Sequence, residues 1–223
     1  MYQPSVEQIE RSQMFEFKEY INGRHGINLE NYQDLHGWSV NQIPDFWEAV
    51  WSYFDIIHSE SYTQIVDDVS KMPGAKWFNG ARLNFAENLL RHRDDKIALI
   101  FKGEGQPTRK LTYCELYLAV AKTAQALKNV GVQKGDCIAG FIPNMPESII
   151  AMLATTSIGA IWSSSSPDFG INGVLDRFSQ IKPKVLFAAN GYFYNGKSHD
   201  SLEKLQGILQ DLPTVEKVVV IPY

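Results

Sequence analysis

Apolar and polar positions follow two different periods along this chain. Up to about residue 75, apolar and aromatic side chains recur at helical spacing, most clearly in the segment 46–54. That segment begins at Pro44-Asp45, a typical helix start. The pattern predicts a helical N-terminal extension over residues 1–75, whose aromatic faces pack as core.

From residue 76 onward, short apolar runs alternate with helical segments. A strand at 97–101 is followed by a turn at 103–107 and a second strand. Beyond these, the expected strands are Cys137 to Ile142, Ala160 to Ser164, Val185 to Ala189 and Val218 to Ile221, and the expected helices are one from Thr112 to Gly131, one from about Pro146, Gly173 to Ile181 and Ser201 to Leu212. No tight hairpin is expected among the strands after residue 137. The alternation predicts an α/β fold with a parallel sheet covered by helices on both faces.

Composition narrows the classes of function. The 223 residues carry a net charge of −4, with 21 Lys and Arg against 25 Asp and Glu, so the electrostatic pattern of a nucleic-acid-binding protein is missing. The two cysteines, Cys114 and Cys137, share no metal-ligand spacing with the five histidines. The polar start of the chain has no apolar segment of a signal peptide. We therefore expect a cytosolic protein that acts on small molecules and has no metal site built from these residues.

One uncharged stretch, Ser148 to Pro167, has about the length that crosses a bilayer. It is rich in Ser and Thr, and Gly159 interrupts it. This composition favours a buried helix followed by a buried strand, and a membrane location is not expected.

A literal match to the phosphate-binding pattern G-x-x-x-x-G-K-[ST] runs from Gly191 to Ser198. In such a loop small residues let the backbone wrap the phosphates, and the helix begins at the Gly-Lys pair. Here three aromatic residues fill the loop, and the capping signal at Asp200-Ser201 places the helix start later. These residues argue against a P-loop nucleotidase, which remains an alternative to the function inferred below.

A serine run, Ser163 to Ser166, lies where a parallel strand is expected to end. Ligands of open α/β sheets bind at such ends, so these hydroxyls are candidate donors to phosphate or carbonyl oxygens. A solvated loop whose serines bond nearby backbone is an equally good interpretation.

Three longer strings are more specific than either motif. They are the segments 77–84 (Trp-Phe-Asn-Gly-Ala-Arg-Leu-Asn), 151–162 (Ala-Met-Leu-Ala-Thr-Thr-Ser-Ile-Gly-Ala-Ile-Trp) and 173–178 (Gly-Val-Leu-Asp-Arg-Phe). Together they resemble the acyl-CoA synthetases of the adenylate-forming superfamily. With Trp162, the serine run and the segment 194–197, the chain is most similar to the members that activate acetoacetate, and the resemblance covers nearly its whole length.

The resemblance implies a reaction and its substrates. In this family a carboxylate attacks the α-phosphate of Mg-ATP, which gives an acyl-adenylate and pyrophosphate, and the thiol of CoA then displaces AMP. The implied substrates are acetoacetate, ATP with Mg, and CoA, and the implied role is in ketone-body and fatty-acid metabolism. It also implies that residues 76–223 are the incomplete first part of the AMP-dependent synthetase/ligase domain.

The family's ATP-binding loop, its later Thr-Gly-Asp motif and its C-terminal lysine have no match here. The expectation is a shortened or partial ligase that is inactive alone and holds no catalytic residue. Related acetyl-CoA synthetases place basic residues of the corresponding loop near the CoA nucleotide. By that likeness Tyr194, Asn195, Gly196 and Lys197 are the candidate CoA-binding residues, with Lys197 foremost. Tyr194 departs from the pattern, because those relatives have a second arginine there, so the phosphate contact would be weaker or replaced by stacking. The alternative from another class is a non-catalytic binding or partner module.

Overall fold

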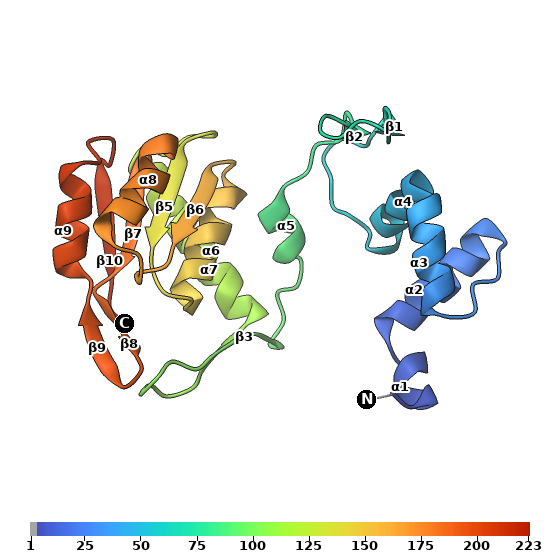
Figure 1. The fold of residues 1–223 in the computed structure, drawn as a ribbon, viewed down its shortest axis with the longest axis horizontal. Coiled ribbons are helices and arrows are strands. Elements are labelled where there is room, and N and C mark those ends of the chain that lie inside the picture. The colour runs from blue at the N-terminus through green and yellow to red at the C-terminus, as the bar shows by residue number, and fades with distance from the viewer. Residues whose placement is uncertain (1–3) are drawn as a thin grey trace. The chain divides into compact units, whose positions relative to one another are not determined.

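The computed structural model describes residues 4–223, which form two compact units, one ending at Leu83 and one spanning Asn84–Tyr223 (Figure 1). The predicted boundary after residue 75 separates two sequence domains and not two compact units, so it stays a prediction. The first three residues of the predicted segment 1–75 lie outside the described part of the chain.

The first unit is mainly helical, as the aromatic pattern predicted. Phe17, Ile21, Leu35 and Ala49 form its buried core, around which aromatic rings pack largely edge to face. Its elements are α1 (Val6–Glu10), α2 (Gln13–His25), α3 (Tyr32–Asn41), α4 (Ile43–Tyr53), β1 (Gln64–Val66) and β2 (Trp77–Asn79). The helix expected at Pro44 is α4, with proline in its first turn.

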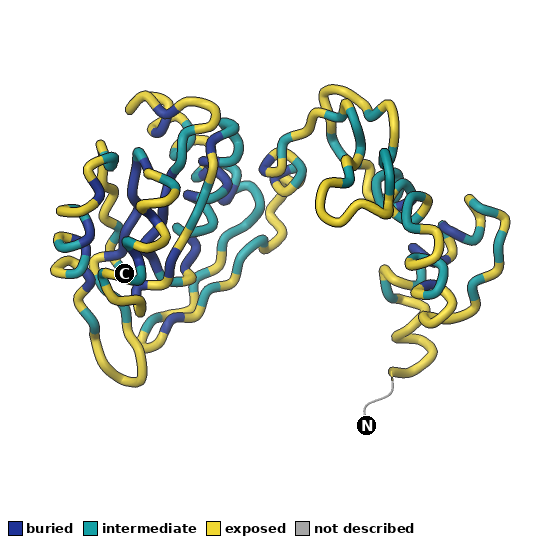
Figure 2. The backbone as a smooth tube through the Cα atoms, turned by 45° about the horizontal axis from the view of Figure 1, so that its top comes forward, coloured by how far each residue is buried: buried dark blue, intermediate teal, exposed yellow. Residues whose placement is uncertain are grey.

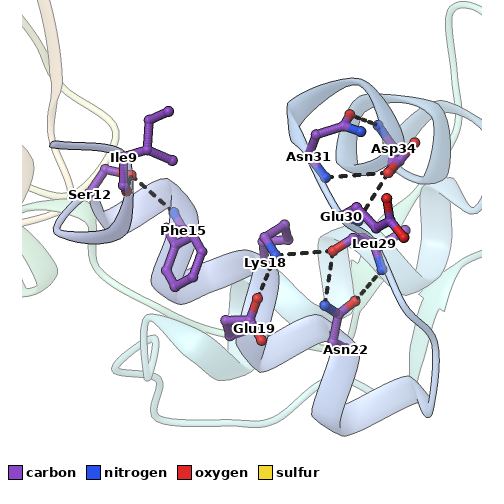
Figure 3. A network of polar contacts seen from close by, with 10 residues as sticks. All are labelled: Ile9, Ser12, Phe15, Lys18, Glu19, Asn22, Leu29, Glu30, Asn31 and Asp34. Atoms are coloured by element: carbon purple, nitrogen blue, oxygen red, sulfur yellow. Dashed lines mark hydrogen bonds and ion pairs between the residues drawn. The ribbon is translucent and has the colours of Figure 1, made fainter. Parts of the chain in front are cut away.

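A polar network fastens the loop after α2 to that helix (Figure 3). Asn22 accepts from the backbone N–H of Leu29 at 2.7 Å and donates to its carbonyl at 3.1 Å. The buried Lys18 donates to the same carbonyl at 3.0 Å. This satisfies both backbone groups of Leu29, which would otherwise be costly to bury. The sequence pattern gave no sign of a buried lysine.

The second unit holds the parallel sheet. Its elements are α5 (Phe85–Leu89), β3 (Ile97–Phe101), β4 (Arg109–Thr112), α6 (Tyr113–Asn129), β5 (Cys137–Phe141), α7 (Pro146–Ser157), β6 (Ile161–Ser165), α8 (Ile171–Ile181), β7 (Val185–Ala189), β8 (Gly191–Tyr194), β9 (Lys197–Asp200), α9 (Leu202–Gln210) and β10 (Lys217–Ile221). The strand order is β10-β7-β5-β6, and every pairing in that sheet is parallel. The predicted α/β class is confirmed.

Helices cover both faces of the sheet, and each face has its own core. On one face α6 and α7 pack over residues such as Ile138, Val185 and Phe187. On the other, α8 and α9 pack over Phe141 and Leu186. Strand β7 is buried along its whole length, as its unbroken apolar run predicted (Figure 2).

Local signals set the helix ends. Thr112 and Glu115 form the predicted capping box of α6, and Gly131 follows the helix with φ +85°. The uncharged stretch that begins at Ser148 becomes α7 and β6, as expected. Among residues 4–223, no helix combines the length and apolarity that a membrane crossing requires.

Candidate functional site

The four parallel strands end at one edge of the sheet, here called the carboxyl edge, which is the usual place for ligands in open α/β folds. The loop of residues 166–170 follows β6, and the strands β8 and β9 follow β7. Both segments carry polar groups at this edge. A small-molecule site is therefore expected in this part of the second unit.

Strands β8 and β9 form an antiparallel hairpin, which corrects the expectation that no hairpin lies in this part of the chain. Tyr194 pairs with Lys197, and Asn195 and Gly196 form the two-residue turn. Both turn residues have positive φ, +51° and +73°. This is the conformation that Asn-Gly favours in two-residue hairpins, so the Asn-Gly pair was the signal that the sequence analysis missed.

The hairpin excludes the P-loop alternative. Residues 191–198 form paired strands instead of a loop that wraps an anion, and α9 begins only at Leu202. The predicted late helix start is confirmed, although the side chain that accepts from Leu202 N is Asp200, at 2.7 Å, and not Ser201. The match to the phosphate-binding pattern is therefore a coincidence of residue types.

All four candidate CoA-binding residues lie together at the tip of the hairpin. Tyr194, Asn195, Gly196 and Lys197 are exposed, and the Tyr194 side chain is 64% exposed. As a cross-strand pair, Tyr194 and Lys197 project from one face of the hairpin. Within the described part of the chain the Lys197 ammonium forms no ion pair. The tip thus offers an unpaired cation beside an aromatic ring, a combination that binds phosphate and stacks on a base.

The same face continues toward the base of the hairpin. Tyr192 and His199 stack with ring centroids 4.9 Å apart. The Tyr192 hydroxyl is hydrogen-bonded to the carboxylate of Asp168, in the loop after β6. Burial, and then this carboxylate, raise the pKa of Tyr192. The bond links the two segments of the carboxyl edge.

A second contact holds the tip itself. The backbone N–H of Gly196 donates to Glu104 Oε1 at 2.7 Å. Glu104 lies in the loop between β3 and β4, whose end meets the tip of the β8–β9 hairpin (Figure 1). On the other face of the hairpin, the rings of Phe193 and Tyr223 lie 5.9 Å apart. Glu104, Asp168 and Tyr192 were not predicted from sequence.

Gly191 permits the close pairing at the base of the hairpin. A Cβ built at this position would lie 2.6 Å from the carbonyl oxygen of His199. Real Cβ atoms do not approach backbone this closely, so any larger residue forces the strands apart. The base of the hairpin therefore requires glycine.

The serine run is divided between strand and loop. Ser163, Ser164 and Ser165 belong to β6, and Ser165 is buried with no hydrogen-bond partner for its hydroxyl among the described residues. Ser166 donates to Asp168 at 3.0 Å. Only Ser166 thus occupies the loop position expected of a ligand donor, and its hydroxyl supports the carboxylate that holds Tyr192.

In the part of the chain that the structure describes, no three His, Cys, Asp or Glu side chains are grouped so that they could hold a metal ion. To a ligand, the carboxyl edge offers the Lys197 ammonium and the exposed Tyr194 ring.

Two family models match the chain. The model "AMP-binding enzyme" matches residues 85–223, and "Acetyl-coenzyme A synthetase N-terminus" matches residues 32–89. The second model thus runs from the helical unit into α5.

Curated and solved relatives agree with these models. The chain is 47% identical to the acetoacetyl-CoA synthetase of Macaca fascicularis, over 100% of this chain and 33% of the relative. It is 45% identical to the acetoacetyl-coenzyme A synthetase of Rhizobium meliloti, over 100% of this chain and 34% of the relative. The structure of acetoacetyl-CoA synthetase from Streptomyces lividans matches with a TM-score of 0.92 at 40% identity, over 99% of this chain and 34% of that one. The chain therefore spans about a third of the length of these relatives, and it belongs to the AMP-binding enzyme family.

Proposed function

We propose that this chain is the front third of an acetoacetate–CoA ligase. The observation that carries the proposal is identity of 45–49% to acetoacetyl-CoA synthetases over at least 93% of the chain. In the proposed reaction the acetoacetate carboxylate attacks the α-phosphorus of ATP and releases pyrophosphate. The CoA thiol then attacks the acyl carbon of the adenylate, forms the thioester and releases AMP, and its proton leaves to solvent. Magnesium would enter bound to ATP.

The hairpin tip is the part of this chain that we assign to CoA. Lys197 would contact a phosphate of the CoA nucleotide, and Tyr194 would stack beside it. Their common face, exposure and place at the carboxyl edge support this assignment. Asn195 and Gly196 would act through the turn that orients the two side chains, while Glu104 and Asp168 fix the hairpin by its tip and its base.

Adenylation is assigned to residues that this chain does not carry. The ATP-binding loop and the later motifs of the family have no match in residues 1–223. We also propose that residues 1–75 act as the helical extension and residues 76–223 as the first part of the AMP-dependent synthetase/ligase domain.

A coupled assay of pyrophosphate release tests whether adenylation requires residues that this chain does not carry. With ATP, acetoacetate and CoA, the 223-residue chain is expected to show no turnover above a blank. A ligase of the relatives' length that carries this chain as its first third is expected to turn over with acetoacetate. Robust turnover by the 223-residue chain alone would contradict the proposal, and so would a long ligase that activates other acids but not acetoacetate.

A further inference from the structure

A carboxylate of the chain itself is bound to the backbone at the hairpin tip. Strand pairing joins Tyr194 and Lys197, which flank the turn, so the strands do not need the N–H of Gly196. This N–H donates to Glu104 Oε1 at 2.7 Å, from a loop 92 positions earlier in the chain. Backbone N–H groups of turns bind anions, because they present a fixed positive dipole. Glu104 thus fills an anion position that adjoins the candidate CoA-binding lysine.

The two opposite charges at the tip do not neutralise each other. Within the described residues neither the Lys197 ammonium nor the Glu104 carboxylate forms an ion pair. The carboxylate therefore satisfies the backbone N–H of Gly196 and leaves the lysine to a ligand. A phosphate that contacts both the ammonium and this N–H must take the place of Glu104, since two anions at one N–H repel each other.

The loop that carries Glu104 is packed at Gly103 but open to solvent at the carboxylate. Gly103 is buried, and a Cβ built there would lie 3.1 Å from the hydroxyl oxygen of Tyr223. Glu104 itself is exposed, and Gly105, which follows it, has φ +67°. Glycine changes its backbone angles at low cost. The carboxylate can therefore turn away from Gly196 while the base of the loop stays packed.

We propose that Glu104 is a specificity-determining residue, which occupies the phosphate position of the hairpin tip in the free protein and is displaced by CoA. The inference rests on the proposed assignment of the tip to CoA. On binding, a phosphate of CoA accepts from the N–H of Gly196 and contacts the Lys197 ammonium, and the Glu104 carboxylate turns to solvent. Only hydrogen bonds and ionic contacts change, and no covalent bond forms or breaks.

The exchange selects ligands that carry phosphate. Displacing Glu104 from Gly196 loses a hydrogen bond to a charged acceptor, and a phosphate restores one of equal or greater strength. Pantetheine, the thiol arm of CoA without its nucleotide, has no phosphate and leaves Glu104 in place. The contact therefore lowers the affinity for CoA to some extent and in return excludes weaker anions from the position beside Lys197.

Two other roles for Glu104 lead to different predictions. If the bond only held the turn in shape, its loss would misplace Lys197 and weaken CoA binding. If the carboxylate only repelled phosphate through space, its charge would matter and its contact with Gly196 would not. Under displacement the contact itself matters. A variant that keeps the charge and breaks the contact therefore separates the three roles.

Titration of this chain with CoA, followed by the amide chemical shifts of the hairpin, tests the inference. Glu104→Gln removes the charge and leaves a weaker acceptor, whereas Glu104→Asp keeps the charge on a shorter side chain that does not reach Gly196. Displacement predicts that both variants bind CoA about three- to tenfold more tightly than the native chain. It also predicts that CoA, and not pantetheine, shifts the amide of Gly105 in the native chain. Asp211→Asn removes an exposed carboxylate at the far end of α9 and should leave CoA binding unchanged.

Each of the other results would overturn the inference. Weaker binding by both variants would assign Glu104 to holding the turn, and tighter binding by Glu104→Gln alone would assign it to repulsion at a distance; in both cases the tip would remain assigned to CoA. Equal binding by the native chain and both variants would remove Glu104 from the site. Hairpin amides that CoA shifts in none of the three proteins would contradict the assignment of the tip as well. Binding is measured without turnover, so failure of the proposed ligase activity would leave these outcomes unchanged.

Discussion

Strand β7 and the β8–β9 hairpin are neighbours in sequence, yet they occupy opposite environments. All five residues of β7 are buried, whereas the hairpin tip is exposed. The strand is fixed by apolar packing on both faces, and the hairpin by a few polar contacts to separate loops. The sheet thus sets the stability of this unit, while the exposed tip of the hairpin can vary its side chains at little cost and is suited to carry a binding group.

The largest expected effect comes from the strand. Leu186→Ala removes a side chain that is fully buried between β7 and the helices α8 and α9. We expect the free energy of unfolding to fall by about 2–5 kcal/mol, because the lost contacts leave a cavity. Denaturant unfolding measures this value. A loss below about 1 kcal/mol, within the range of surface substitutions, would show that the strand is not the stabilising part.

Gly191→Ala tests the junction between the two regions. The new Cβ would meet the carbonyl oxygen of His199 at 2.6 Å, so the hairpin must open at its base. We expect a loss of about 1–3 kcal/mol, typical of overpacking, with the largest chemical-shift changes in β8 and β9. The control without a clash is Gly173→Ala, where a Cβ meets nothing closer than 3.5 Å and where alanine favours the helix α8. Equal stability of the two variants would mean that the hairpin is not closely paired.

Tyr192→Phe removes the hydroxyl that joins the hairpin to Asp168. The expected loss is smaller, about 0.5–1.5 kcal/mol, as for a typical hydrogen bond. The pKa of Tyr192 is raised in the folded state, so the protonated hydroxyl stabilises the folded protein. This contribution to the free energy of unfolding is fully present below the ordinary tyrosine pKa of 10.0 and is lost as the pH rises through the folded-state pKa. Unfolding followed from pH 8 upward should therefore show a decline that Tyr192→Phe reduces. A decline of the same size in the native protein and in Tyr192→Phe would show that the bond between Tyr192 and Asp168 does not stabilise the folded state.

Sequence pattern predicted the buried region far better than the exposed one. The bounds of β7 were predicted without error, because an unbroken apolar run of five residues has few other interpretations. The hairpin was not predicted, because residues 191–198 also match a phosphate-binding pattern in which the Asn-Gly pair would belong to a loop. The contacts of Gly196 with Glu104 and of Tyr192 with Asp168 join distant parts of the chain, and no local periodicity encodes such contacts. The four candidate CoA-binding residues were predicted from the family resemblance alone. The structure shows that they lie together at the tip of one hairpin.

The smallest expected effect on stability belongs to the residue with the largest expected effect on binding. Lys197→Ala should change the free energy of unfolding by no more than about 0.5 kcal/mol, since its side chain is exposed and unpaired within the described part of the chain. A charge-assisted contact to phosphate contributes about 1.5–3 kcal/mol, or about ten- to a hundredfold in binding. Lys128→Ala, at an exposed lysine of α6, is the matched control.

The most direct measurement uses a ligase of the relatives' length whose first third is this chain. For Lys197→Ala we predict that kcat/KM for CoA falls about ten- to a hundredfold, while the ATP–pyrophosphate exchange rate stays unchanged because that half-reaction does not use CoA. Lys128→Ala should alter neither. An unchanged dependence on CoA in Lys197→Ala, or an equal loss in both half-reactions, would contradict the assignment of the hairpin tip to CoA.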